Sequence, residues 1–201
     1  PTQWMTMLIT EKELCHELMG RSVDAAISRL SLLHEAVGNR CVAWGIAADD
    51  AGTQRGEFIR PDLWAEMIKP HYARLCSWVH AHTEWKTFLH SCGSVYHLIP
   101  HMIEAGVDIL NPVQTSAANM EPERMTREFG GKLVFWGGGC DTQHVLGNGS
   151  PEEVRTHVRE RLELFKTGGG YVFTQVHNIQ PNVPPENIVA MLDAAYEYGV
   201  F

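Results

Sequence analysis

A histidine and a cysteine separated by one residue form the strongest chemical signal in this sequence. His90 and Cys92 close an apolar, β-prone segment at residues 87–89. Side chains two apart on a strand point to the same side, so an imidazole and a thiolate can converge on one point. Both groups are common zinc ligands. The spacing therefore predicts the beginning of a zinc site at the end of a buried strand, completed by ligands from elsewhere in the chain.

Other polar side chains of reactive type also follow apolar segments. Asp49 and Asp50 come directly after the apolar run at 41–48, and they could position a substrate, exchange protons or offer an oxygen ligand. The amides of Asn111 and Gln114 flank Pro112 after a later apolar run and could orient a substrate. In α/β barrels the active site is built at the carboxyl ends of the strands. We therefore expect these loops to face one mouth.

The elements that must position these residues alternate between helix and strand. Thr10 with Glu13 resembles a capping box, and Ser150 followed by Pro151 reads as the start of another helix. Apolar strands separated by helices are typical of a parallel sheet in an α/β fold. We expect one domain over residues 1–201. The expected helices are 10–38, 61–82, 95–105, 121–129, 151–166 and 185–198, and the expected strands are 41–48, 86–90, 107–111, 133–136 and 171–175.

Composition limits the class of protein. The chain has 201 residues, 44% of them apolar and 20% charged, with a net charge of −8. Without a basic run, nucleic acid and anionic membranes are not expected partners. No apolar segment approaches the roughly 18 residues of a membrane span. The five cysteines are scattered and odd in number, which favours a reducing cytoplasm over a secreted disulfide framework.

Several segments, taken together and in order, resemble the uroporphyrinogen decarboxylase superfamily, above all its uncharacterised decarboxylase-like members. The resemblance covers nearly the whole chain. It implies a TIM-type (β/α)8 barrel, of which this chain would supply about five βα units as the C-terminal part. The superfamily also contains zinc-dependent methyltransferases that act with corrinoid proteins. The segments that carry the resemblance are 49–54, 90–93 (His-Ser-Cys-Gly), 106–114, 135–143 and 168–180.

The resemblance implies a zinc-dependent methyltransferase, which moves a methyl group between a corrinoid protein and a small substrate or thiol. The His-x-Cys pattern of that branch maps onto His90 and Cys92. The family's later cysteine falls where this chain has His177, while Cys140 offers another thiol at a strand end. Either of these two could complete the site, and three protein ligands leave one position for substrate. Zinc would activate a thiol by lowering its pKa, and the thiolate would attack a methyl group on cobalt.

Two other functions are compatible with the resemblance. One is decarboxylation of uroporphyrinogen, a reaction that needs no metal and would have no use for the Cys92 thiol. Arg55 and Arg60 are the only arginines expected near the mouth, which does not suggest a clamp for tetrapyrrole carboxylates. The other is a non-catalytic truncated barrel that acts as a subunit. Its exposed strand edges would invite pairing, so a partner chain or a homo-oligomer could cover them.

Overall fold

The structure is a computed structural model that describes residues 2–200. The chain forms two compact units, each drawn from separated stretches of sequence. Unit 1 comprises the residues up to 48 together with 57–89 and 97–108, and unit 2 comprises 49–56, 90–96 and the residues from 109 onward. All the metal and catalytic candidates identified above therefore belong to unit 2.

Helices and strands alternate, as the sequence predicts. The strands are β1 (Ala43–Ala48), β2 (Lys86–His90), β3 (Ile109–Asn111), β4 (Val134–Trp136) and β5 (Tyr171–Val172). The α-helices are α1 (Thr2–Thr10), α2 (Lys12–Val37), α3 (Pro61–Met67), α4 (Lys69–His82), α5 (Ile99–Glu104), α6 (Pro122–Phe129), α7 (Pro151–Phe165) and α8 (Pro185–Tyr198). Short 3-10 turns occupy Gly38–Arg40, Tyr96–Leu98 and Lys166–Gly168.

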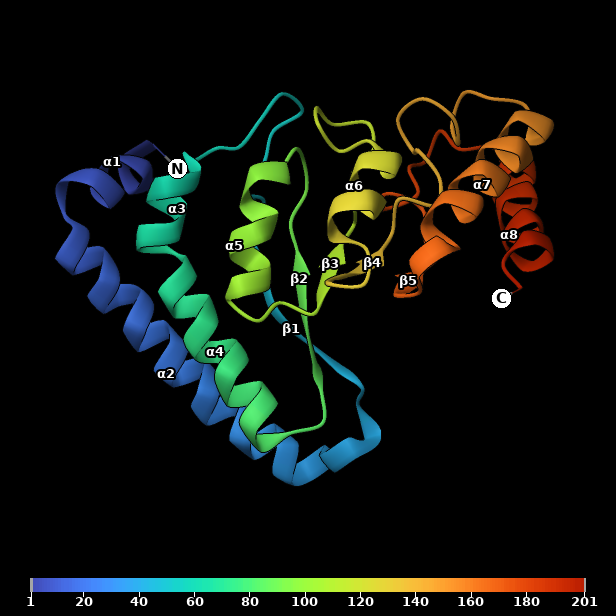
Figure 1. Ribbon diagram of the computed structural model, residues 1–201. Coiled ribbons are helices and arrows are strands. Elements are labelled where there is room, and N and C mark those ends of the chain that lie inside the picture. The colour runs from blue at the N-terminus through green and yellow to red at the C-terminus, as the bar shows by residue number, and fades with distance from the viewer. Residues whose placement is uncertain (1, 201) are drawn as a thin grey trace. The chain divides into compact units, whose positions relative to one another are not determined.

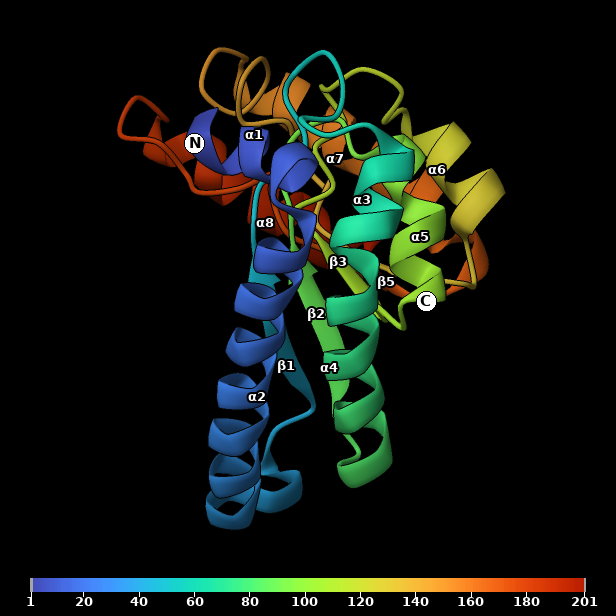
Figure 2. The ribbon, with the colours of Figure 1, turned by 90° about the vertical axis from the view of Figure 1, so that its left-hand side faces the viewer.

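Unit 1 is organised around two long helices. α2 and α4 run side by side (Figures 1 and 2). A cluster of buried apolar residues accompanies them, with the Trp85 indole 1% exposed and donating to the carbonyl of Gly38. The buried members of this cluster are Val23, Leu30, Leu75, Val79 and Trp85. This packing, rather than helix propensity alone, stabilises a helix as long as α2.

Two expectations for the helices of unit 1 are wrong. The expected helix 61–82 breaks after Met67, because Pro70 has no amide hydrogen with which to continue the helical ladder. The expected capping by Thr10 does not occur either. Its hydroxyl donates to the carbonyl of Thr6 inside α1, and α2 begins after Glu11 without a side-chain cap.

Unit 2 is a run of parallel βα repeats. β3 pairs with β4, and β4 pairs with β5, both in parallel. α7 and α8 lie against each other (Figure 1) over an apolar cluster that includes Val158 and Met191. The expected start of α7 is confirmed: the Ser150 hydroxyl accepts from the backbone of Glu153, whose carboxylate accepts from the backbone of Ser150. The α/β class is confirmed as well.

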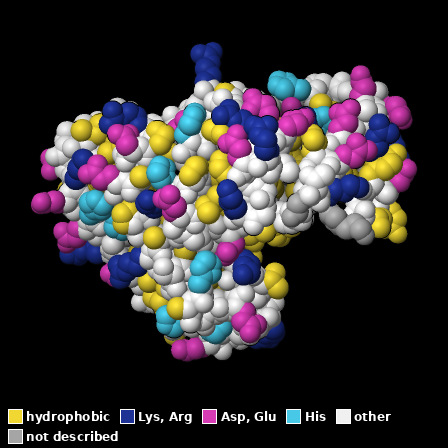
Figure 3. Space-filling view, viewed as in Figure 1, with side chains coloured by type: hydrophobic (Ala, Val, Ile, Leu, Met, Phe, Trp, Pro, Cys, Tyr) yellow, Lys and Arg dark blue, Asp and Glu magenta, His cyan; other side chains and the backbone are white. Residues whose placement is uncertain are grey.

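The surface carries both signs of charge. On the face seen in Figure 3, basic and acidic side chains are interspersed rather than gathered into a field of one sign. Within residues 2–200, no helix combines the length and the apolar character that crossing a membrane requires.

Candidate metal centre

Three side chains of ligating type meet in unit 2. One ligand atom each from His90, Cys92 and His177 lies within 4.8 Å of the others. Among the described residues, no other group of three or more His, Cys, Asp or Glu side chains is arranged to hold a metal ion. The Cys92 Sγ is 3.5 Å from His90 Nε2. The rings of His90 and His177 are 5.6 Å apart, edge to face. The structure thus brings together the two residues that strand geometry predicts and one of the two candidates for a third ligand.

The end of β2 determines where His90 and Cys92 lie. Along β2 buried positions alternate with exposed or half-buried ones, so Thr87 and Leu89 enter the core. His90 ends the strand, and both His90 and Cys92 are half-buried, while His177 is exposed. An apolar strand therefore carries the imidazole and the thiol to its carboxyl end, where they remain accessible.

A second loop holds the His90–Cys92 segment from one side. The carboxylate of Asp50 accepts a hydrogen bond from the Cys92 amide at 3.0 Å. The Ala51 amide donates to the Ser91 hydroxyl at 3.0 Å. Since Ser91 is 2% exposed, this buried hydroxyl is satisfied by a main-chain donor. The loop after β1 thereby fixes the backbone that presents the thiol.

Two glycines allow these loops to touch. Gly93 adopts a φ of +84°, and a Cβ added there would lie 2.4 Å from the carbonyl carbon of Gly52. A Cβ on Gly52 would meet the carbonyl oxygen of Ser94 at 2.5 Å. Only glycine permits such an approach between two backbones. The position of Cys92 thus depends on two residues that have no side chain.

The two amides expected to orient substrate are bonded to the protein itself. Asn111 Oδ1 lies 2.6 Å from His90 Nδ1, and its Nδ2 donates to the Trp136 carbonyl at 2.9 Å. Gln114 Oε1 accepts from the Gly93 amide at 2.8 Å, and its Nε2 donates to Gln54 Oε1 at 2.8 Å. Both amides therefore support the segment that bears His90 and Cys92.

His177 and Cys140 occupy different environments. His177 has a left-handed φ of +59°, and its carbonyl accepts from Gln175 Nε2 at 2.9 Å. The Cys140 side chain is fully buried among apolar residues such as Leu146 and Val158, outside the three grouped ligand atoms. Burial, followed by the charge of Asp141, raises the pKa of the Cys140 thiol to about 12. We therefore leave Cys140 out of the ligand set proposed below.

The carboxylates expected to act in the site differ in what they contact. Asp50 faces the Cys92 segment, and Asp49 is exposed one residue earlier. Burial, followed by the negative charge of Asp50, raises the pKa of the Cys92 thiol to about 12. Without a nearby cation the thiol therefore keeps its proton at neutral pH. In that state its S–H can donate to His90 Nε2.

Sequence reasoning overlooked the supporting roles of Ser91 and Gln54. The position of Ser91 between the two ligands is a usable signal, because its side chain must point to the opposite side of an extended segment. Gln54 lies in a segment that carries the family resemblance, but nothing in the sequence identifies its contact, in which its Oε1 accepts from Gln114 across 60 residues of chain. Its role depends on how the loops fold together.

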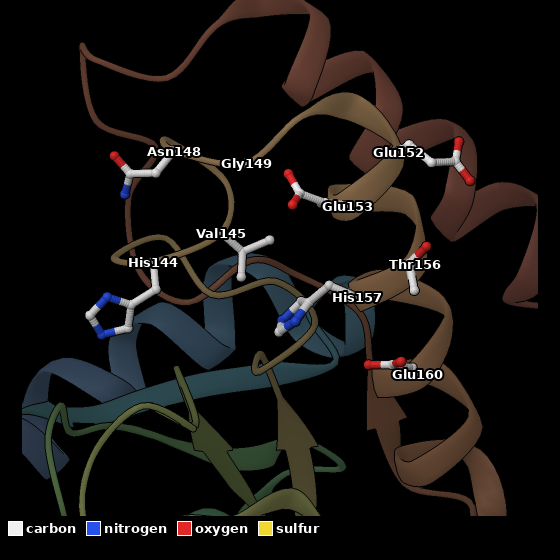
Figure 4. A pocket seen from close by; sticks show the side chains of 9 residues that line it. All are labelled: His144, Val145, Asn148, Gly149, Glu152, Glu153, Thr156, His157 and Glu160. Carbon is white, nitrogen blue, oxygen red and sulfur yellow. The ribbon is translucent and has the colours of Figure 1, made fainter.

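A separate hollow of about 440 Å³ lies between loop 144–149 and α7. Figure 4 shows Val145, Glu153 and His157 directed toward it, while Glu152 points away. His157 Nε2 accepts from the backbone amide of Asp141 at 3.3 Å, and burial lowers the pKa of this imidazole. The Glu153 carboxylate already caps α7. His157 and Glu153, which face this hollow, thus have structural roles.

Parallel βα repeats with ligating side chains at the ends of the strands are typical of TIM-type barrels. The fold class of this chain is therefore part of a TIM-type barrel. A solved methyltransferase from Methanosarcina mazei has this fold: it superposes on 99% of this chain with a TM-score of 0.75 at 20% identity, and 54% of its own length is covered. The family model described as uroporphyrinogen decarboxylase (URO-D) matches residues 1–198. The chain belongs to the uroporphyrinogen decarboxylase family.

Curated relatives agree with this assignment. The uroporphyrinogen decarboxylase of Anaeromyxobacter dehalogenans (strain 2CP-C) is 28% identical over 98% of this chain and 52% of its own length. That of Pseudoalteromonas translucida (strain TAC 125) is 43% identical over 36% of this chain and 20% of its own length. The chain thus spans about half the length of the first of these relatives.

Proposed function

We propose that the protein is a zinc-dependent methyltransferase of this family, which moves a methyl group between a corrinoid protein and a small thiol substrate. The observation that carries the proposal is the convergence of His90, Cys92 and His177 within 4.8 Å. Two imidazoles and one thiolate form a donor set that suits zinc, and three protein ligands leave a fourth position for substrate. When bound, zinc would supply a Lewis acid that lowers the pKa of a substrate thiol.

The chain's own residues would hold and orient the reactants. Cys92 and the two imidazoles would bind the metal, and the Asp50 carboxylate would keep the Cys92 backbone in place through its amide. In the transfer itself the substrate thiol would first lose its proton to water, and its sulfur would then form a bond to the methyl carbon as the bond from carbon to cobalt breaks. Both electrons of the broken bond stay on cobalt, so no other oxidant or reductant is needed.

Decarboxylation of uroporphyrinogen is the second candidate, because the curated relatives bear that name. Against it stands the thiol of Cys92, placed 3.5 Å from an imidazole nitrogen, for which a decarboxylation without metal has no role. The methyltransferase proposal accounts for this pair of side chains, and we therefore favour it.

One assay separates the two functions. The purified protein, loaded with zinc, is incubated with methylcobalamin and a thiol, and loss of the methyl–cobalt bond is followed by absorbance. We expect demethylation that requires both the thiol and the metal, with its rate abolished by chelation. In a parallel reaction, uroporphyrinogen is monitored for loss of carboxyl groups. Decarboxylation that persists with chelator, with no demethylation, would contradict the proposal.

Zinc affinity should increase with pH. The Cys92 thiol has a pKa of about 12 and is protonated between pH 7 and 9, so zinc must displace that proton. Each unit of pH in this range should therefore raise the apparent affinity about tenfold through this group. Competition with a chromophoric zinc chelator at three pH values measures the slope. An affinity independent of pH would show that the Cys92 thiolate is not a ligand.

A further inference from the structure

We propose that Asn111 is a positioning residue that fixes the tautomer of His90, so that Nε2 is left with a lone pair for the metal. This inference rests on the proposed zinc site, but it concerns only side chains that the structure describes. A histidine can bind a cation through one ring nitrogen only if that nitrogen carries no proton. The hydrogen bond made by the other ring nitrogen decides which tautomer is present.

The polarity of this hydrogen-bond chain is fixed at its far end. The Trp136 carbonyl can only accept, so the amide group that faces it at 2.9 Å must be the Asn111 NH2. The oxygen of the same amide then faces His90 Nδ1 at 2.6 Å. Because that oxygen can only accept, His90 Nδ1 must be the donor and must carry the hydrogen.

The sequence explains why the Trp136 carbonyl takes a side-chain donor. In the parallel ladder Leu110 pairs with Phe135, and Gly138 donates to the Pro112 carbonyl two residues further on. In a regular parallel ladder, the amide hydrogen of residue 112 would be donated to the Trp136 carbonyl on the neighbouring strand. Proline has no amide hydrogen. The Asn111 side chain supplies the donor instead. Pro112 thus leaves the Trp136 carbonyl unpaired by the main chain, and Asn111 satisfies it.

The consequence reaches the ligand atoms. With the proton on Nδ1, the lone pair of His90 Nε2 is directed to the side of the ring where Cys92 Sγ lies at 3.5 Å. Gln114 follows the same strand, but its amide contacts Gly93 and Gln54 and leaves the ring alone. Among the described residues that surround the metal site, Asn111 is therefore the one whose side chain can hold the hydrogen on Nδ1.

The tautomer can be measured without any metal. In the 201-residue chain labelled with 15N in its histidine rings, long-range 1H–15N correlation spectra report which ring nitrogen carries the proton, and His90→Gln identifies the signal. We expect His90 to be in the Nδ1–H form in the wild type and to lose this preference in Asn111→Leu. An Asn111→Leu spectrum identical to that of the wild type would overturn the inference.

Zinc affinity provides a second readout. Substitution of a residue that orients a metal-bound histidine typically costs about 10- to 100-fold in affinity. We expect a loss of this size in Asn111→Leu. Asn148→Leu is the matched control, because the Asn148 amide also donates to a backbone carbonyl, that of Gln143, but contacts no grouped ligand. An equal loss in Asn148→Leu would overturn the inference.

The two readouts separate this inference from the proposed function. If the wild type binds no zinc, the proposed function fails, while the ring spectra still decide the role of Asn111. If the wild type binds zinc and Asn111→Leu binds it equally well with an unchanged spectrum, the proposed function stands and the role of Asn111 is refuted.

Discussion

Cys92→Ser is expected to reduce the zinc content from about one ion per chain to near zero. The hydroxyl of serine ionises far less readily than a thiol, so the substitution removes the one anionic ligand of the proposed set while changing the volume little. The two histidines that remain are too few for a stable zinc site. Metal analysis of the purified protein after exposure to equimolar zinc measures the outcome.

Two other cysteines serve as matched controls. Cys41 is exposed in unit 1, and Cys41→Ser should retain the metal. Cys140 is the alternative thiol and is fully buried, so Cys140→Ala should reduce stability but retain zinc. A Cys92→Ser protein that still binds one equivalent, or a Cys140→Ala protein that is folded and metal-free, would refute the proposed ligand set.

Gly93→Ala is expected to lower the free energy of unfolding by about 2–5 kcal/mol, the sum of two costs. A non-glycine residue at a φ of +84° costs about 1–2 kcal/mol. The added methyl group would also meet the Gly52 backbone at 2.4 Å, and relieving such an overlap costs a further 1–3 kcal/mol, roughly. Urea denaturation followed by circular dichroism measures the change. Because the displaced segment carries Cys92, zinc binding should weaken as well.

Gly131→Ala isolates the contribution of the backbone angle. Gly131 has a φ of +75°, but nothing lies within 4 Å of an added Cβ. We expect this variant to lose only about 1–2 kcal/mol, the cost of the backbone angle alone, and to keep its zinc. If the two variants were equally destabilised, the close approach of the loops at Gly93 would contribute nothing to the loss of stability.

Sequence reasoning predicted the elements of the fold well where one local signal dominates. The helix 185–198 is confirmed at both ends, and the start of α7 follows from Ser150 and Pro151. Errors occur where tertiary context decides. The strand expected at 171–175 pairs only over Tyr171–Val172, and beyond it Gln175 makes an isolated bridge with Cys140.

The candidate site was predictable in part. A period of two along a strand is enough to bring His90 and Cys92 together. Selection between His177 and Cys140 depends on the path of the backbone. Residue types do not reveal the left-handed φ of +59° at His177. Nor do they reveal that the Val176 amide donates a hydrogen bond to the Cys140 carbonyl. The partners of Asn111 depend on strand register, which the sequence does not reveal.

Pro112 links the construction of the sheet to its reactivity. Parallel strands are usually joined by hydrogen bonds between main-chain groups. Here the side-chain amide of Asn111 makes one of these bonds, to the Trp136 carbonyl, and also contacts the His90 imidazole. One side chain therefore connects the hydrogen bonding of the sheet to the imidazole of the metal site. An amide hydrogen at residue 112 would compete with the Asn111 side chain for the Trp136 carbonyl. A change in the backbone of the adjacent strand would then alter which ring nitrogen of His90 carries the proton.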